Sequence, residues 1–122
     1  MEERILYELK SVYRDPMRIR GYFFGSGEQS ACIVGAARGN EVQQMYICSQ
    51  LVKIFTQLEQ QNKIHDGKSV LIIPTINSYS MNIGKRFWST DNTDINRMFP
   101  GYHLGETTQR IAAGVFEHIN TY

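Results

Sequence analysis

Residues 31–36, ACIVGA, run directly into residues 37–41, ARGNE, and this stretch decides the fold. The first six residues are small or apolar on both faces of an extended chain, which is typical of a central strand covered on both sides. After the turn, apolar positions recur at spacings of three and four residues and predict a helix over about residues 41–61. Asn40 is the expected N-cap, and Glu41 suits the positive end of the helix dipole. The sequence therefore predicts a strand that leads into a helix.

Residues 69–74, SVLIIP, are a second stretch that is apolar on both faces. Together with the preceding strand and helix they predict a βαβ unit, in which the two strands are parallel and the crossover is right-handed. A last amphipathic helix is expected over about residues 107–120.

Upstream of this unit, residues 4–9 and 17–24 alternate between apolar and polar positions and predict two strands around a turn at Pro16. Gly25–Glu28 predicts a further hairpin turn. We therefore expect an α/β fold: a mainly parallel central sheet with flanking helices and an antiparallel hairpin at one edge. The expected domain is a single one over residues 1–122.

Composition limits the function classes. The chain has 122 residues, 42% of them hydrophobic and 20% charged, with a formal net charge of +1. This near-neutral balance gives no argument for a nucleic-acid partner or an anionic membrane surface. The sequence shows neither a secretory leader nor an apolar run long enough to span a membrane. Cys32 and Cys48 lie in apolar segments and are expected as reduced thiols, so we expect a cytoplasmic protein.

A candidate site follows from the topology. In α/β sheets ligands bind beyond the carboxyl ends of parallel strands, and the two loops that follow the predicted parallel strands must emerge at the same side. Three arginines near a helix N-terminus suit a carboxylate or phosphate. The alternative is a solvated loop whose charges pair with one another, and the residues alone favour it slightly. The polar residues that these loops bring together are Arg38, Glu41, Asn77, Arg86, Asp94, Asn96 and Arg97.

Several ordered motifs resemble a known family. They are GAARGNE (35–41), IIPTIN (72–77), GKRFWSTDNTDINRMFPG (84–101) and TTQRIA (107–112). Over about residues 20–118 they are similar to the succinylglutamate desuccinylase and aspartoacylase branch of the zinc carboxypeptidase superfamily. The resemblance implies a zinc-carboxypeptidase-like fold, here incomplete, and zinc-dependent hydrolysis of an amide bond next to a carboxylate in a small N-acyl amino acid or peptide.

The resemblance also implies roles for individual residues. Glu41 matches a zinc-binding glutamate of the family, and Arg86 matches the arginine that polarises the scissile carbonyl. Asn96 and Arg97 match the pair that holds the substrate carboxylate. Arg38 stands where the family has a zinc-binding histidine.

Two departures point away from family chemistry. Arg38 has no lone pair to offer zinc, so it is expected to pair with Glu41 and to put positive charge at the metal position, as part of a substrate- or anion-binding site. The family takes a further histidine ligand and a glutamate base from beyond a helix like 107–120, whereas this chain stops at Tyr122. His103 and Glu106 have ligand-like spacing, but we interpret them as a solvated loop.

The chain thus corresponds to the N-terminal half of a hydrolase domain, with weak or no activity expected alone. The alternative is a metal-free pseudo-enzyme or anion-binding module with an arginine-lined pocket. The expected ligand is a small carboxylate-bearing substrate or an anion. An incomplete sheet also predicts uncovered edges and helix faces, for which self-association is one remedy.

Overall fold

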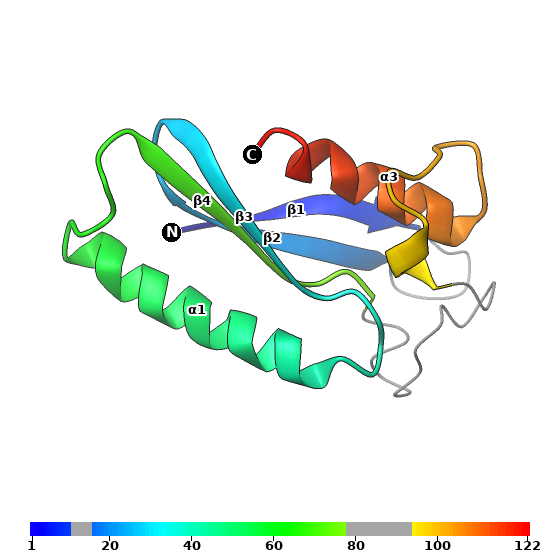
Figure 1. The fold of residues 1–122 in the computed structure, drawn as a ribbon, viewed down its shortest axis with the longest axis horizontal. Helices are drawn as coiled ribbons and strands as arrows, with labels where there is room; N and C mark the ends of the chain where they lie inside the picture. The colour runs from blue at the N-terminus through cyan, green and yellow to red at the C-terminus, as the bar shows by residue number, and fades with distance from the viewer. Residues whose placement is uncertain (11–15, 78–93) are drawn as a thin grey trace.

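The computed structural model describes residues 1–10, 16–77 and 94–122, and in them a four-stranded sheet lies between two helices (Figure 1). The strands lie side by side in the order β1-β2-β4-β3. In chain order the elements are β1 (Glu2–Leu9), β2 (Met17–Gly25), β3 (Glu28–Ala36), α1 (Val42–Gln60), β4 (Lys68–Thr75), η1, a single 3-10 turn (Ile95–Arg97), and α3 (Thr107–Ile119).

The expectation of a mainly parallel sheet is wrong. β3 and β4 are parallel, as the βαβ unit requires, but β1 pairs with β2 and β2 pairs with β4 in antiparallel fashion. The edge hairpin is confirmed as β1 and β2. The architecture is therefore α/β with a mixed sheet, in which antiparallel pairs outnumber the parallel one.

The connection from β2 to β3 is not the predicted hairpin turn, because β4 lies between these two strands. Gly25 and Gly27 have φ values of 75° and 110°, which only glycine adopts readily, and they let the chain step across this gap. A side chain at position 27 would begin 2.6 Å from the carbonyl oxygen of Gly67. The two glycines thus leave room for β4 to insert.

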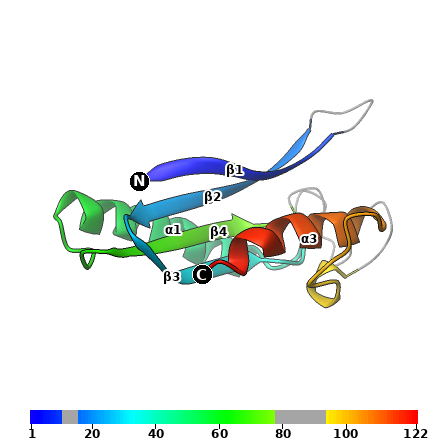
Figure 2. The ribbon, with the colours of Figure 1, turned by 90° about the horizontal axis from the view of Figure 1, so that it is seen from above.

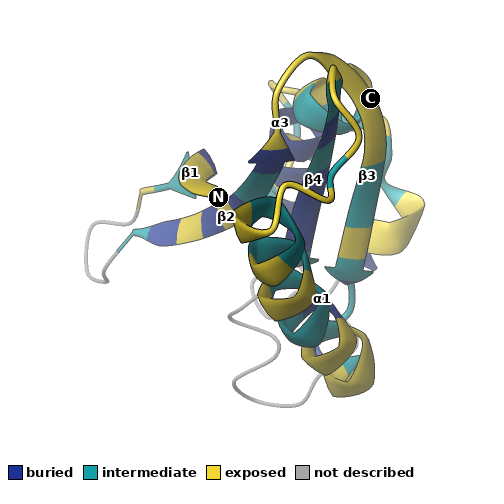
Figure 3. Cartoon of the chain, turned by 90° about the vertical axis from the view of Figure 1, so that its left-hand side faces the viewer, coloured by how far each residue is buried: buried dark blue, intermediate teal, exposed yellow. Residues whose placement is uncertain are grey.

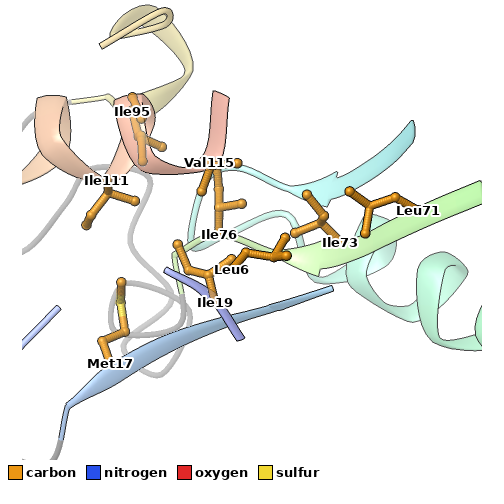
Figure 4. Packing of buried hydrophobic residues seen from close by; sticks show 10 residues of the cluster. Leu6, Met17, Ile19, Leu71, Ile73, Ile76, Ile95, Ile111 and Val115 are labelled. Carbon is orange, nitrogen blue, oxygen red and sulfur yellow. The ribbon is translucent and has the colours of Figure 1, made fainter. Parts of the chain in front are cut away.

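β4 takes the central position because its side chains are apolar in both directions. Leu71 and Ile73 point into a core beneath α3, while Ile72 points to the other face beneath α1. All three are fully buried. Figure 4 shows the first of these cores, where Ile111 and Val115 of α3 meet residues of the sheet.

β3 is an edge strand, which corrects the expectation that it is covered on both sides. In the part of the chain that the structure describes it pairs with β4 alone, and its first four residues are exposed (Figure 3). Val34, near its end, is 36% exposed. The sequence pattern could not distinguish β3 from β4, because both are apolar on both faces.

The two helices cover opposite faces of the sheet (Figure 2). Helix α1 buries Cys48 and packs Val52 and Phe55 against the sheet. Helix α3 begins with a capping box, in which the Glu106 side chain accepts from the N3 backbone N–H and Gln109 accepts from the Glu106 backbone. None of the helices described is both long and apolar enough to cross a membrane.

Candidate functional site

The loop after β3 is held by its own backbone and by Glu41. The Arg38 N–H donates to Glu41 Oε1 at 2.8 Å, and the Glu41 N–H donates back to the Arg38 carbonyl at 3.1 Å. Ile76, just after β4, donates its N–H to the Ala36 carbonyl at 3.1 Å. The N-cap of α1 is Glu41 and not the expected Asn40, and its side chain caps no helical N–H. The reason is that the carboxylate bonds to the loop that precedes the helix.

A second polar segment, the turn η1, lies at the same end of the sheet (Figure 1). Asp94 precedes this turn and caps it, because its Oδ1 accepts from the Asn96 N–H at 3.1 Å. Ile95 is fully buried in the core beneath α3 and fixes the turn to the fold. The Asp94 side chain is only 5% exposed. A buried carboxylate at this position needs positive partners.

Arg38 is such a partner. Its Nε lies 3.2 and 3.1 Å from the two oxygens of Asp94, and its Nη2 lies 2.9 Å from Oδ2. The hydrogen bonds to Asp94 raise the pKa of the Arg38 guanidinium. The expected pairing of this side chain with Glu41 is therefore corrected, since Glu41 accepts from the Arg38 backbone while the guanidinium reaches Asp94. The sequence carried a usable signal for Asp94, because an aspartate two residues before an Asn-Arg pair is typical of a turn cap.

The two residues that the resemblance assigns to the substrate carboxylate differ in exposure. The Arg97 side chain is 73% exposed, and its Nε lies 3.8 Å from Asp94 Oδ2. Asn96 lines an apolar cavity of about 290 Å³ beside the open edge of β3. The other residues around this cavity are Val34, Gly35, Ala37, Ile76, Phe99, Phe116 and Ile119. The capped turn thus carries an arginine that is exposed to solvent and an asparagine that lines an apolar cavity.

The expected neighbourhood is confirmed for the loop around Arg38 and Glu41 and the turn with Asp94 to Arg97. Arg86, the expected catalytic residue, lies outside the described residues. The roles of Glu41 as a metal ligand and of Asn96 and Arg97 as substrate ligands stay predictions.

The donor set at this site does not fit zinc. Position 38 offers a guanidinium, which carries positive charge and has no lone pair, and the Glu41 and Asp94 carboxylates already accept hydrogen bonds from Arg38. Residues 1–10, 16–77 and 94–122 contain no group of three histidine, cysteine, aspartate or glutamate side chains able to hold a metal ion.

All three histidines of the sequence have other contacts. His65 bonds to the Asp66 carbonyl, His118 bonds to the Leu6 carbonyl, and His103 pairs with Glu117 at 2.8 Å. The side chains of His103 and Glu117 are both exposed, and Glu106 is the N-cap of α3. Both His103 and Glu106 are exposed, as expected of a solvated loop, but Glu106 also belongs to the capping box of α3. Both cysteines are free thiols, and burial raises the pKa of each.

Comparisons with known proteins agree with this geometry. The family model of the succinylglutamate desuccinylase/aspartoacylase catalytic domain matches residues 28–121. The comparison with curated proteins gave no significant match.

Solved structures give the same picture. An aspartoacylase family protein from Mesorhizobium loti is 26% identical, with a TM-score of 0.69 over 84% of this chain and 31% of its own. A succinylglutamate desuccinylase/aspartoacylase from Rhodobacter sphaeroides is 22% identical, with a TM-score of 0.71 over 91% and 34%. A putative carboxypeptidase A from Shewanella denitrificans is 13% identical and shares the fold, with a TM-score of 0.72 over 98% and 31%.

The chain spans about a third of the length of each of these structures. Its matched region holds β3, α1, β4, η1 and α3, and therefore both segments of the candidate site. The chain belongs to the succinylglutamate desuccinylase/aspartoacylase family of hydrolases, which is carboxypeptidase-like in fold.

Proposed function

We propose that this chain supplies the carboxylate-binding part of an amide hydrolase that acts on small N-acyl amino acids, and that it does not cleave them alone. One observation carries the proposal: Arg97 is largely exposed on a turn whose cap, Asp94, is buried and paired. A guanidinium carried on a turn that is held in this way can bind a carboxylate through two N–H groups. The names of the relatives, desuccinylase and aspartoacylase, support N-succinyl and other N-acyl amino acids as ligands.

Binding can be measured by isothermal titration of the whole chain with N-succinylglutamate. The Arg97→Gln variant should bind about tenfold or more weakly, because a hydrogen-bonded pair of charges contributes roughly 1.5–3 kcal/mol. Arg110→Gln is the matched control, since Arg110 is also exposed but lies on α3 outside the site. Equal affinity of both variants and the wild type would remove the basis of the proposal.

Catalysis is tested separately. Metallohydrolases of this kind need a metal in an open coordination site and a base, and the described residues contain no group of three side chains able to hold a metal ion. We therefore expect no release of free glutamate from N-succinylglutamate, with or without added zinc. Turnover by the wild-type chain with stoichiometric zinc would show that it is a complete zinc hydrolase.

A second candidate function is a metal-free anion-binding module, and the Arg38–Asp94 pair favours it. Such a module would bind inorganic phosphate as well as a carboxylate, because guanidinium groups suit both anions. Competition separates the two functions. If phosphate at equal concentration displaces N-succinylglutamate, the general anion site is supported, and if it does not, the site is selective for the amino acid.

Self-association and a cytoplasmic location also stay proposals. A second copy could cover the open edge of β3, because a two-fold axis near Cys32, the middle residue of the strand, would pair it with itself in antiparallel fashion. The apolar cavity beside Val34 supports this arrangement. A cytoplasmic location is supported by the two free thiols.

A further inference from the structure

We propose that the Arg38–Asp94 pair replaces a metal as the tie between the two halves of the site, so that the site keeps its shape without metal and excludes divalent cations. The pair joins residues that are 56 positions apart in the chain. One partner lies in the loop after β3 and the other caps the turn that carries Arg97. The inference rests on the proposed function only in its last step, where the tie orients Arg97 for a carboxylate.

The geometry of the tie is that of a strong pair. Asp94 receives two different N–H groups of Arg38 at 2.9 to 3.2 Å and a backbone N–H from Asn96 at 3.1 Å. An arginine that binds a carboxylate through two nitrogens fixes direction as well as distance. The Arg38 side chain is 27% exposed, so its other face remains open to solvent.

The same pair explains why a divalent cation is excluded. A metal bound by Glu41 and Asp94 would compete with the Arg38 N–H groups for Glu41 Oε1 and for both oxygens of Asp94. It would also lie next to the guanidinium, and two cations at such a distance repel each other strongly when they are shielded from water. Arg38 therefore competes with any metal ion for the carboxylates of Glu41 and Asp94.

Arg38 is a positioning residue in this proposal, because it acts through Asp94. With Asp94 held, the turn keeps its cap and Arg97 keeps its place 3.8 Å from the same carboxylate. Without Arg38, the charge of Asp94 would attract Arg97 and draw it away from an external carboxylate. Loss of Arg38 should therefore weaken ligand binding even in a chain that remains folded.

A double-mutant cycle tests the tie without any ligand. Arg38→Met and Asp94→Asn should each lower the Tm by roughly 5 °C, and the double variant should lose little more than either single variant. The control cycle uses Arg20→Met and Glu3→Gln, whose side chains meet at 3.3 Å on the surface, and its small effects should add. Additive losses in the Arg38–Asp94 cycle would overturn the tie.

Exclusion of metal is tested with zinc alone. Wild-type protein purified without added zinc should contain less than about a tenth of an equivalent, and EDTA should leave its Tm unchanged. Arg38→His, which offers an imidazole beside Glu41 and Asp94, should bind zinc at least tenfold more tightly than the wild type, whereas Arg97→His should not. Stoichiometric zinc in the wild type, or no gain in Arg38→His, would overturn the exclusion.

Orientation of Arg97 is tested with N-succinylglutamate. Arg38→Met should weaken binding about tenfold at a temperature where the variant is folded, and Arg38→Lys should recover part of this loss because it keeps the charge. If the wild type does not bind N-succinylglutamate, the proposed function fails while the tie and the zinc exclusion stand on the first two experiments. If binding is intact in Arg38→Met, the proposed function stands and the positioning role fails.

Discussion

The two edge strands of the sheet, β1 and β3, differ in the charge that they carry and in what covers them. Ion pairs join β1 to its neighbour β2, among them Arg18 with Glu8 and Arg20 with Glu3. β1 also has an irregular register between Ile5 and Tyr7. Charges and irregularities of this kind protect an edge from pairing with another chain.

β3 carries much less charge: within the strand only Glu28, its first residue, is charged, and the irregularity in its register also lies near this end, between Gln29 and Ala31. No charged residue occurs from Gln29 to Ala37, and an apolar cavity of about 290 Å³ lies beside the end of the strand. In the third of the family's length that this chain spans, one edge is therefore charged along the strand and the other is uncharged over most of its length. The proposed self-association through β3 depends on this contrast.

The largest expected effect concerns the open edge. Val34→Lys should turn an associating protein into a monomer, because a lysine on an edge strand opposes strand pairing. Ile5→Lys is the matched control on β1, where Ile5 is 53% exposed and the edge is already charged. Sedimentation velocity at several protein concentrations measures the outcome. A wild-type chain that is monomeric at all concentrations would contradict self-association through β3.

The next effect compares how closely the backbone is packed at a glycine of β3 and at a glycine of β2, the neighbour of the other edge strand. Gly35→Ala in β3 would place a Cβ 2.3 Å from the Pro74 carbonyl oxygen and 2.9 Å from Cys48 Sγ. Because backbone cannot move aside, we expect a loss of roughly 2–4 kcal/mol in the free energy of unfolding. At Gly21 in β2 the nearest atoms, at 2.7 and 2.8 Å, are side-chain ends of Leu71 and Leu6, which can rotate.

Gly21→Ala should therefore cost less, about 1–2 kcal/mol. Urea unfolding of the two variants gives both values. A larger loss at Gly21 than at Gly35 would mean that β3 is held less tightly against β4 than its backbone contacts indicate.

A smaller effect depends on pH. Partial burial raises the pKa of the Cys32 thiol in β3 to about 11 from an ordinary value near 9.0. Between these two values the unfolded chain ionises and the folded chain does not, so the unfolded state binds fewer protons and stability falls as pH rises. Below pH 9 the thiol is neutral in both states and this dependence is absent.

The loss by pH 11 should stay below about 2 kcal/mol, since the exposed part of the side chain lets water screen the thiolate. Cys32→Ala should show a shallower fall in stability than the wild type above pH 9, because it lacks this thiol. Parallel curves for the two proteins would place Cys32 in contact with water along the open edge.

The two edges also differ in how well the sequence predicts them. β1 and β2 were predictable because their polar and apolar residues alternate, and alternation is the signature of a half-buried hairpin. β3 and β4 were both found as strands, but a strand that is apolar on both faces is equally consistent with a central position and with an edge that something else covers. That ambiguity produced the wrong, mainly parallel sheet.

The candidate site shows the same limit at the level of single residues. The positions of Arg38 and Asp94 at one end of the sheet followed from the predicted pair of parallel strands, because the loops after such strands emerge at the same side. Their bond did not, because the sequence equally allowed Arg38 to reach Glu41, three residues away. Only the turn that buries Asp94 beneath the loop decides between the two carboxylates.

The smallest expected effect is at the charged edge. Arg18 donates to Glu8 at 2.8 Å, and both side chains remain partly exposed to water. Arg18→Ala should change the free energy of unfolding by less than about 1 kcal/mol, because solvent screens such a pair and ordering two long side chains opposes it. The measurement is urea unfolding at low and high salt, with Glu8→Gln as the control for the other partner.

Removing these charges should change the self-association of the chain and not its stability. If Arg18 and Glu8 act by keeping β1 from pairing with another chain, replacing both with threonine should leave the Tm nearly unchanged but increase self-association of the Val34→Lys variant, whose other edge is already blocked. A loss of stability well above 1 kcal/mol would instead mean that the charges hold the hairpin itself together. In that case the charges of β1 would serve the stability of the hairpin, and they would not explain why β3 pairs with another chain while β1 does not.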